Sequence, residues 1–88
     1  MPEGDAMAKH SHEFVERYNG LVGFGYDRKT NEKTLEFYLQ KFSDDEHAAL
    51  MLSRMSDEDM EELFNLLGRL LKEYLTEEEY HSLFLKDD

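Results

Sequence analysis

The chain has 88 residues, of which 35% are charged, and its formal net charge at pH 7 is −11. Such an acidic excess argues against direct binding of nucleic acid, because proteins that bind it neutralise phosphates with clustered Lys and Arg. The sequence has no cysteine for disulfides or thiolate metal sites, and no apolar run long enough for a signal or membrane segment. We therefore expect a cytoplasmic protein that does not bind membranes.

The first eleven residues are polar and rich in small side chains, which predicts a flexible arm over 1–11 and one domain over 12–88. In the first half of that domain, residues 21–26 and 34–42 are rich in aromatic and aliphatic residues. The polar, turn-prone residues 27–33 separate them, as in a β-hairpin.

The Asn19-Gly20 dipeptide is a strong hairpin turn, and it predicts a third strand over residues 13–18. A short helix over the same residues is the alternative, with Ser11 as its cap and Gly20 as its end. We favour the strand, and so expect a hairpin or three-strand meander in the N-terminal half.

The second half repeats one pattern three times: Ser43, Ser56 and Thr76 each precede three acidic residues and an apolar-periodic stretch. The hydroxyl can accept a bond from a first-turn N–H, and the carboxylates favour the positive end of the helix dipole. This predicts helices over 44–55, 57–75 and 77–85. With the expected strands, the sequence indicates an α+β fold whose two to three helices pack on one face of a small sheet.

The long helix over 57–75 carries apolar residues at three- and four-residue spacing, and the stripe is wider than one small sheet would cover. Gly68 interrupts this helix, which indicates either simple tolerance or the close approach of a neighbouring element. The expected interaction surface consists of Leu63, Leu67, Leu70, Leu71, Tyr74, Tyr80 and Phe84.

Candidate chemistry is weak everywhere in the sequence. Two acid-x-x-His pairs, Asp44 with His47 and Glu78 with His81, fall in the first turns of short helices, where capping acids are expected anyway. His10 and His12 offer two imidazoles for weak metal binding. We therefore predict no enzyme, no cofactor and no native metal site.

The sequence favours a small acidic protein-interaction module that uses an apolar helix face with an acidic rim, with an unknown protein or a second copy as partner. One alternative is a nucleic-acid mimic that inhibits a basic protein. A metal-binding protein or enzyme is a weaker alternative.

Overall fold

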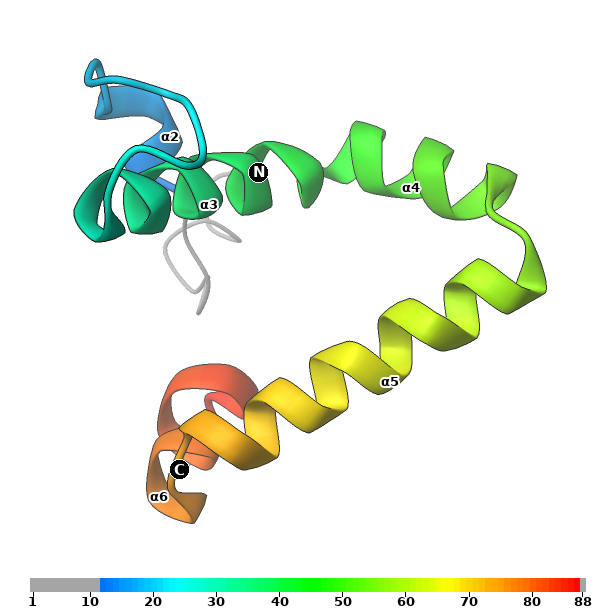
Figure 1. Cartoon of the computed structure of the whole chain (residues 1–88). Helices are drawn as coiled ribbons and strands as arrows, with labels where there is room; N and C mark the ends of the chain where they lie inside the picture. The colour runs from blue at the N-terminus through cyan, green and yellow to red at the C-terminus, as the bar shows by residue number, and fades with distance from the viewer. Residues whose placement is uncertain (1–11, 88) are drawn as a thin grey trace, which may run out of the picture. The chain divides into compact units, whose positions relative to one another are not determined.

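A computed structural model describes residues 12–87, whose regular elements are all helical, with no strand among these residues (Figure 1). The expected flexible arm over 1–11, with Ser11 and His10, lies outside the described residues. The chain divides into two compact units, one ending at Met51 and one beginning at Leu52, and each is described by itself. The elements in order are α2 (Phe14–Arg17), α3 (Arg28–Phe42), α4 (Asp45–Arg54), α5 (Asp57–Tyr74), α6 (Glu77–Glu79) and the π-helical segment η1 (Tyr80–Leu85).

The predicted α+β fold with an N-terminal hairpin is wrong, because its main strand and its turn together form the single helix α3. The polar residues taken for a turn are a helix start: Asp27 is the N-cap, and its carboxylate accepts a hydrogen bond of 2.7 Å from the Thr30 N–H. Arg28, the first residue of α3, donates a 2.8 Å hydrogen bond to Glu32 one turn further along the helix. A capped first turn of this kind supports propagation of the helix through the residues that follow.

Residues 34–42 carry two periodicities at once, which explains the error. Leu35, Phe37 and Leu39 alternate as in a strand, whereas Leu35, Tyr38, Leu39 and Phe42 recur as on one helix face. Because the strand pattern would need a partner strand and the helical pattern needs only its own cap, the capped start decides between them.

The third predicted strand is also wrong, and the alternative of a short helix is the observed one. Residues Phe14–Arg17 form α2, whose N-cap is Glu13 without a side-chain hydrogen bond, and Tyr18 ends the helix in an extended conformation. Residues 21–26 form a loop instead of a strand. In this loop Gly25 has φ +107°, a conformation that favours glycine, and its N–H donates to the Asn31 side chain at 2.8 Å.

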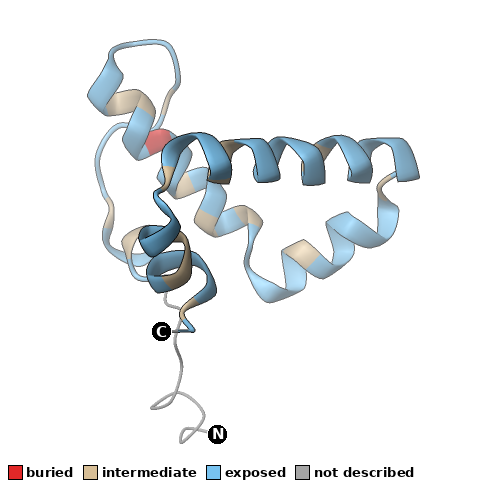
Figure 2. Ribbon diagram, turned by 90° about the horizontal axis from the view of Figure 1, so that it is seen from below, coloured by how far each residue is buried: buried red, intermediate tan, exposed pale blue. Residues whose placement is uncertain are grey.

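The loop and α2 pack against one side of α3. Thr34 on α3 is only 3% exposed, and its hydroxyl oxygen accepts from the Gly23 N–H at 3.0 Å and lies 3.2 Å from the Gly23 carbonyl. Gln40 accepts a 2.9 Å bond from the Val15 N–H. These links are mostly polar: among residues 12–87 Thr34 is the one fully buried residue, and no apolar side chain is fully buried (Figure 2).

Two helices of the second half, α5 and α6, begin at hydroxyl caps. The Ser56 hydroxyl accepts from the Asp59 N–H at 3.0 Å and starts α5, and Thr76 with Glu79 forms a reciprocal capping box that starts α6. Ser43 differs from the expectation, because it is the C-cap of α3 and α4 begins at Asp45. At the other end, the His81 carbonyl accepts from the N–H groups of both Lys86 and Asp87, which closes η1.

Acid should loosen the start of α3. Hydrogen bonds from the Thr30 backbone N–H and then its hydroxyl hold the pKa of Asp27 below its ordinary 3.8, and the bond from Arg28 lowers the pKa of Glu32 below 4.5. Because both pKa values fall on folding, this stabilisation is present above the unfolded-state values and is lost as the pH falls through the folded-state values. We expect a modest effect below about pH 5, since both groups are exposed.

The backbone amide shift of Thr30, followed by NMR during acid titration, measures this loss. Asp27→Asn is the matched variant, because the amide oxygen still caps α3 but does not titrate. An Asp27→Asn chain with the same acid profile at Thr30 would show that another group controls this helix start.

Candidate functional site

One side of α5 gathers all the apolar residues of that helix except Leu66, which projects about 100° from Leu67. At 100° per residue, seven side chains project within about 60° of the direction of Leu67. We call this stripe the α5 face, and it consists of Met60, Leu63, Phe64, Leu67, Leu70, Leu71 and Tyr74.

The α5 face is poorly covered. Phe64 is 75% exposed and Tyr74 70% exposed, and Leu67 near the middle of the helix is 46% exposed. Leu63, Leu70 and Leu71 are half-buried. Large exposed apolar surface is unusual unless something binds it, so the α5 face is the strongest candidate for an interaction surface.

Acidic residues flank the α5 face. Asp57, Asp59, Glu61 and Glu73 project about 80–120° from Leu67, on both sides of the stripe. The two basic residues of the helix, Arg69 and Lys72, lie on the opposite side, where Arg69 donates a 2.8 Å hydrogen bond to Glu73. The rim that a partner would meet is therefore acidic.

The other predicted surface residues, Tyr80 and Phe84, lie on η1. Their rings stack on each other with centroids 5.5 Å apart, and Phe84 remains 51% exposed whereas Tyr80 is half-buried. Tyr80 also lines a shallow groove of about 390 Å³ with residues from the end of α5. The groove is lined by Gly68, Leu71, Lys72, Leu75, Thr76, Glu77 and Tyr80.

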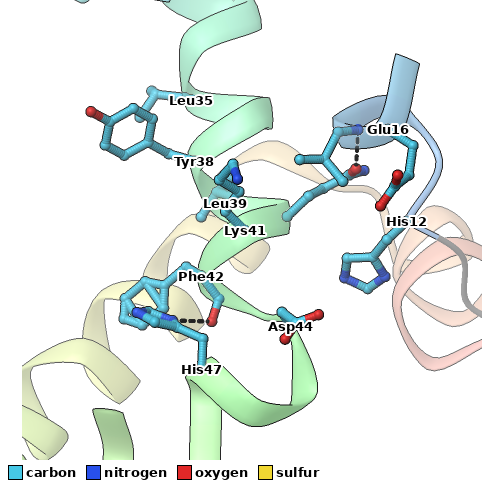
Figure 3. Close-up of a pocket in the computed structure, with 11 residues that line it drawn as sticks. His12, Glu16, Leu35, Tyr38, Leu39, Lys41, Phe42, Asp44 and His47 are labelled. Carbon is cyan, nitrogen blue, oxygen red and sulfur yellow. Dashed lines mark hydrogen bonds between the residues drawn. The ribbon is translucent and has the colours of Figure 1, made fainter. Parts of the chain in front are cut away.

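The weak candidates for metal chemistry are used for other contacts. The His47 imidazole lies 2.9 Å from the Phe42 carbonyl oxygen and meets the Phe42 ring edge-on, as Figure 3 shows, instead of pairing with Asp44. His81 lies 3.0 Å from Asp87 and 3.7 Å from Glu77. Residues 12–87 hold no group of three or more His, Asp or Glu side chains arranged to bind a metal ion.

A second apolar surface, on α3, was missed by the sequence reasoning. We call it the α3 face; it consists of Leu35, Tyr38, Leu39 and Phe42, and it lines an open groove of about 620 Å³ in the first unit (Figure 3). Tyr38 is 62% exposed and Leu39 60% exposed. The spacing i, i+3, i+4, i+7 of these residues indicates this face, but their alternating pattern also predicts a strand, and the strand prediction hides the face.

The space beside Gly68, where a side chain would project, is empty in this chain. A Cβ atom at Gly68 would meet nothing within 4 Å beyond the local helix backbone, so no described neighbouring element approaches it. Gly68→Ala should therefore raise the free energy of unfolding by about 1 kcal/mol, through helix propensity alone. Urea unfolding at low protein concentration, followed by circular dichroism, measures this change.

Gly25→Ala is the control for that experiment. Its Cβ would also meet nothing within 4 Å, but φ +107° is strained for alanine, so this substitution should destabilise the chain. If Gly68→Ala were destabilising as well, a contact at Gly68 in the free protein would be indicated.

Within the described residues, none of the helices combines the length and the hydropathy needed to cross a bilayer. No protein-family model, curated protein or solved structure matches this chain. The two exposed helix faces and the charges around them are the features of this chain that bear on its function.

Proposed function

We propose that this chain is a small acidic protein-interaction module of the cytoplasm that binds its partner through the α5 face. The observation that carries the proposal is the exposure of Phe64, Leu67 and Tyr74 between acidic flanks. The stripe follows one face of an eighteen-residue helix, so an extended partner segment can contact several turns at once.

The free energy available from this face is large enough for specific binding. Complete burial of one Leu or Phe side chain contributes about 1.5–3 kcal/mol, and the α5 face holds seven apolar residues, each already partly fixed in position by the helix. Association itself costs several kcal/mol in lost motional freedom, so only part of this burial becomes affinity. The exposed aromatic residues Phe64 and Tyr74 are expected to contribute most.

The acidic rim indicates what kind of partner fits. Asp59 and Glu73 flank one edge of the α5 face, and Asp57 and Glu61 flank the other. A second acidic surface would be repelled, whereas basic residues beside an apolar stripe would be attracted and oriented. The fitting partner is therefore an amphipathic helix with Lys or Arg along its flanks. The cysteine-free composition supports a reducing, cytoplasmic setting for this interaction.

A synthetic amphipathic peptide, with leucine on one face and lysine along both flanks, is a suitable probe for this proposal. Phe64→Glu and Leu67→Glu should each weaken its binding at least about tenfold, because each places a charge in the apolar contact. Asn65→Glu adds the same charge on the opposite side of α5 and should change the affinity by less than about twofold. Fluorescence anisotropy measures binding, and circular dichroism checks that the helices are retained.

Equal binding by Phe64→Glu, Leu67→Glu and Asn65→Glu would contradict the proposal, since the α5 face would then not be in the contact. The salt dependence of binding distinguishes this proposal from the alternative of a nucleic-acid mimic. Binding through the α5 face should largely persist when the salt concentration rises, because exposed charges are screened and apolar contacts are not. A mimic would compete with DNA for a basic protein and would release it at high salt.

A further inference from the structure

His81 lies between two carboxylates that contact different nitrogens of its ring. The Asp87 carboxylate oxygens lie 3.0 Å and 3.3 Å from Nδ1, and a Glu77 carboxylate oxygen lies 3.7 Å from Nε2. A neutral imidazole carries a hydrogen on one of these nitrogens, whereas the imidazolium carries one on each. The arrangement therefore fits the protonated ring, in which both nitrogens present a hydrogen to a negative group.

These contacts join the two ends of the C-terminal segment. Glu77 begins α6, and Asp87 follows η1. Between them Lys86, the nearest basic residue in the sequence, has a left-handed backbone with φ 55°, and its N–H and that of Asp87 both donate to the His81 carbonyl. A left-handed residue with a side chain is unfavourable and π-helical turns are rare, so the turn over 80–87 depends on contacts at its ends.

The other charged groups near His81 are few. Glu78 shares a shallow pocket with Glu77 and His81, and Lys72 at the end of α5 lines the neighbouring groove with Glu77. His81 is the only histidine in residues 52–88, the second unit. Because carboxylates and amines ordinarily titrate outside the range from about pH 5.5 to about pH 8, a change of pH within it acts on this unit through His81.

We propose that His81 is a pH-sensitive clamp, which holds the turn over residues 80–87 closed when its ring is protonated and loosens the turn when the ring loses its proton. The two carboxylates favour the charged ring in the folded chain over the unfolded one. The stabilisation is therefore present below the unfolded-state titration of histidine, near about pH 6.5, and is lost as the pH rises through the titration of His81 in the folded chain.

The clamp acts on an aromatic surface at the end of α5. The turn that it closes carries the stacked rings of Tyr80 and Phe84, and Tyr80 lines the groove with Leu71 and Leu75. Loosening the turn would thus release this stack. The His81 side chain is 45% exposed and that of Asp87 50% exposed, so the pH effect is graded and modest. The inference concerns this turn alone and does not depend on the proposed function.

An NMR titration of the full chain from about pH 5.5 to about pH 8 tests the contacts, with the His81 ring signals as readout. Asp87→Asn keeps the shape but removes the nearer charge, and it should lower the titration midpoint of His81 by about 0.5–1 pH unit. Glu77→Gln should lower the midpoint by less, because its oxygen lies further from the ring. Glu61→Gln is the matched control.

The control removes one negative charge near the start of α5, about 20 Å along the helix from its end. At physiological salt this distance exceeds the screening length, so Glu61→Gln should move the His81 midpoint by less than about 0.2 pH unit.

The closure of the turn is measured by the ¹⁵N–¹H heteronuclear NOE of the Lys86 and Asp87 amides, which reports backbone order on the picosecond to nanosecond timescale. In the wild-type chain the NOE should be higher at about pH 5.5 than at about pH 8, and should change with the same midpoint as the His81 ring. In His81→Gln it should be low at both pH values, since the amide side chain carries no charge.

Three results would overturn the inference. An unchanged His81 midpoint in both Asp87→Asn and Glu77→Gln would show that the two carboxylates do not act on the ring. An equal shift in Glu61→Gln and Asp87→Asn would assign the effect to overall charge. If His81 titrated while the NOE of Lys86 and Asp87 stayed constant, the contacts would exist but would not hold the turn.

Discussion

The shortage of apolar burial is the constraint on which the rest of this structure depends. Among residues 12–87 the one fully buried residue is Thr34, which is polar, and aromatic residues such as Phe64 and Tyr38 are mostly exposed. Hydrophobic burial is the dominant favourable term in folding, and a chain of this size has little of it even when well packed. Local interactions therefore define the helices, and the apolar faces stay available for intermolecular contacts.

Capping is the clearest of those local interactions. Asp27, Ser56 and Thr76 each accept a hydrogen bond from an N–H in the first turn of the helix that follows. Each cap accepts a hydrogen bond from a first-turn N–H that has no acceptor within the helix. The acidic residues that follow Ser56 and Thr76 lie at the positive end of the helix dipole, which favours negative charge. Much of the acidity of this protein thus serves helix formation first. In the proposed function, the acids that flank the α5 face would also favour a basic partner surface.

The two apolar faces link this architecture to the proposed function. In the first unit, α2 and the loop before α3 hold one side of α3 and leave the α3 face open. In the second unit, η1 stacks Tyr80 on Phe84 near the end of α5 but leaves Phe64 and Tyr74 exposed. Each of these two faces lies on a helix whose start is fixed by its own cap.

The sequence by itself determined the start of α5, the start of α6 and the amphipathic stripe with Leu67 at its centre, because caps and three- and four-residue spacing act within one helix. It also indicated that the acids cluster at helix starts. It did not determine the N-terminal half, where Leu35, Phe37 and Leu39 fit a strand as well as a helix. The pattern of one segment does not show whether another strand is present to pair with it. Only the tertiary structure decided that α2 and the loop cover one side of α3. The α3 face is exposed for that reason, since which side of a helix is covered depends on what packs against it.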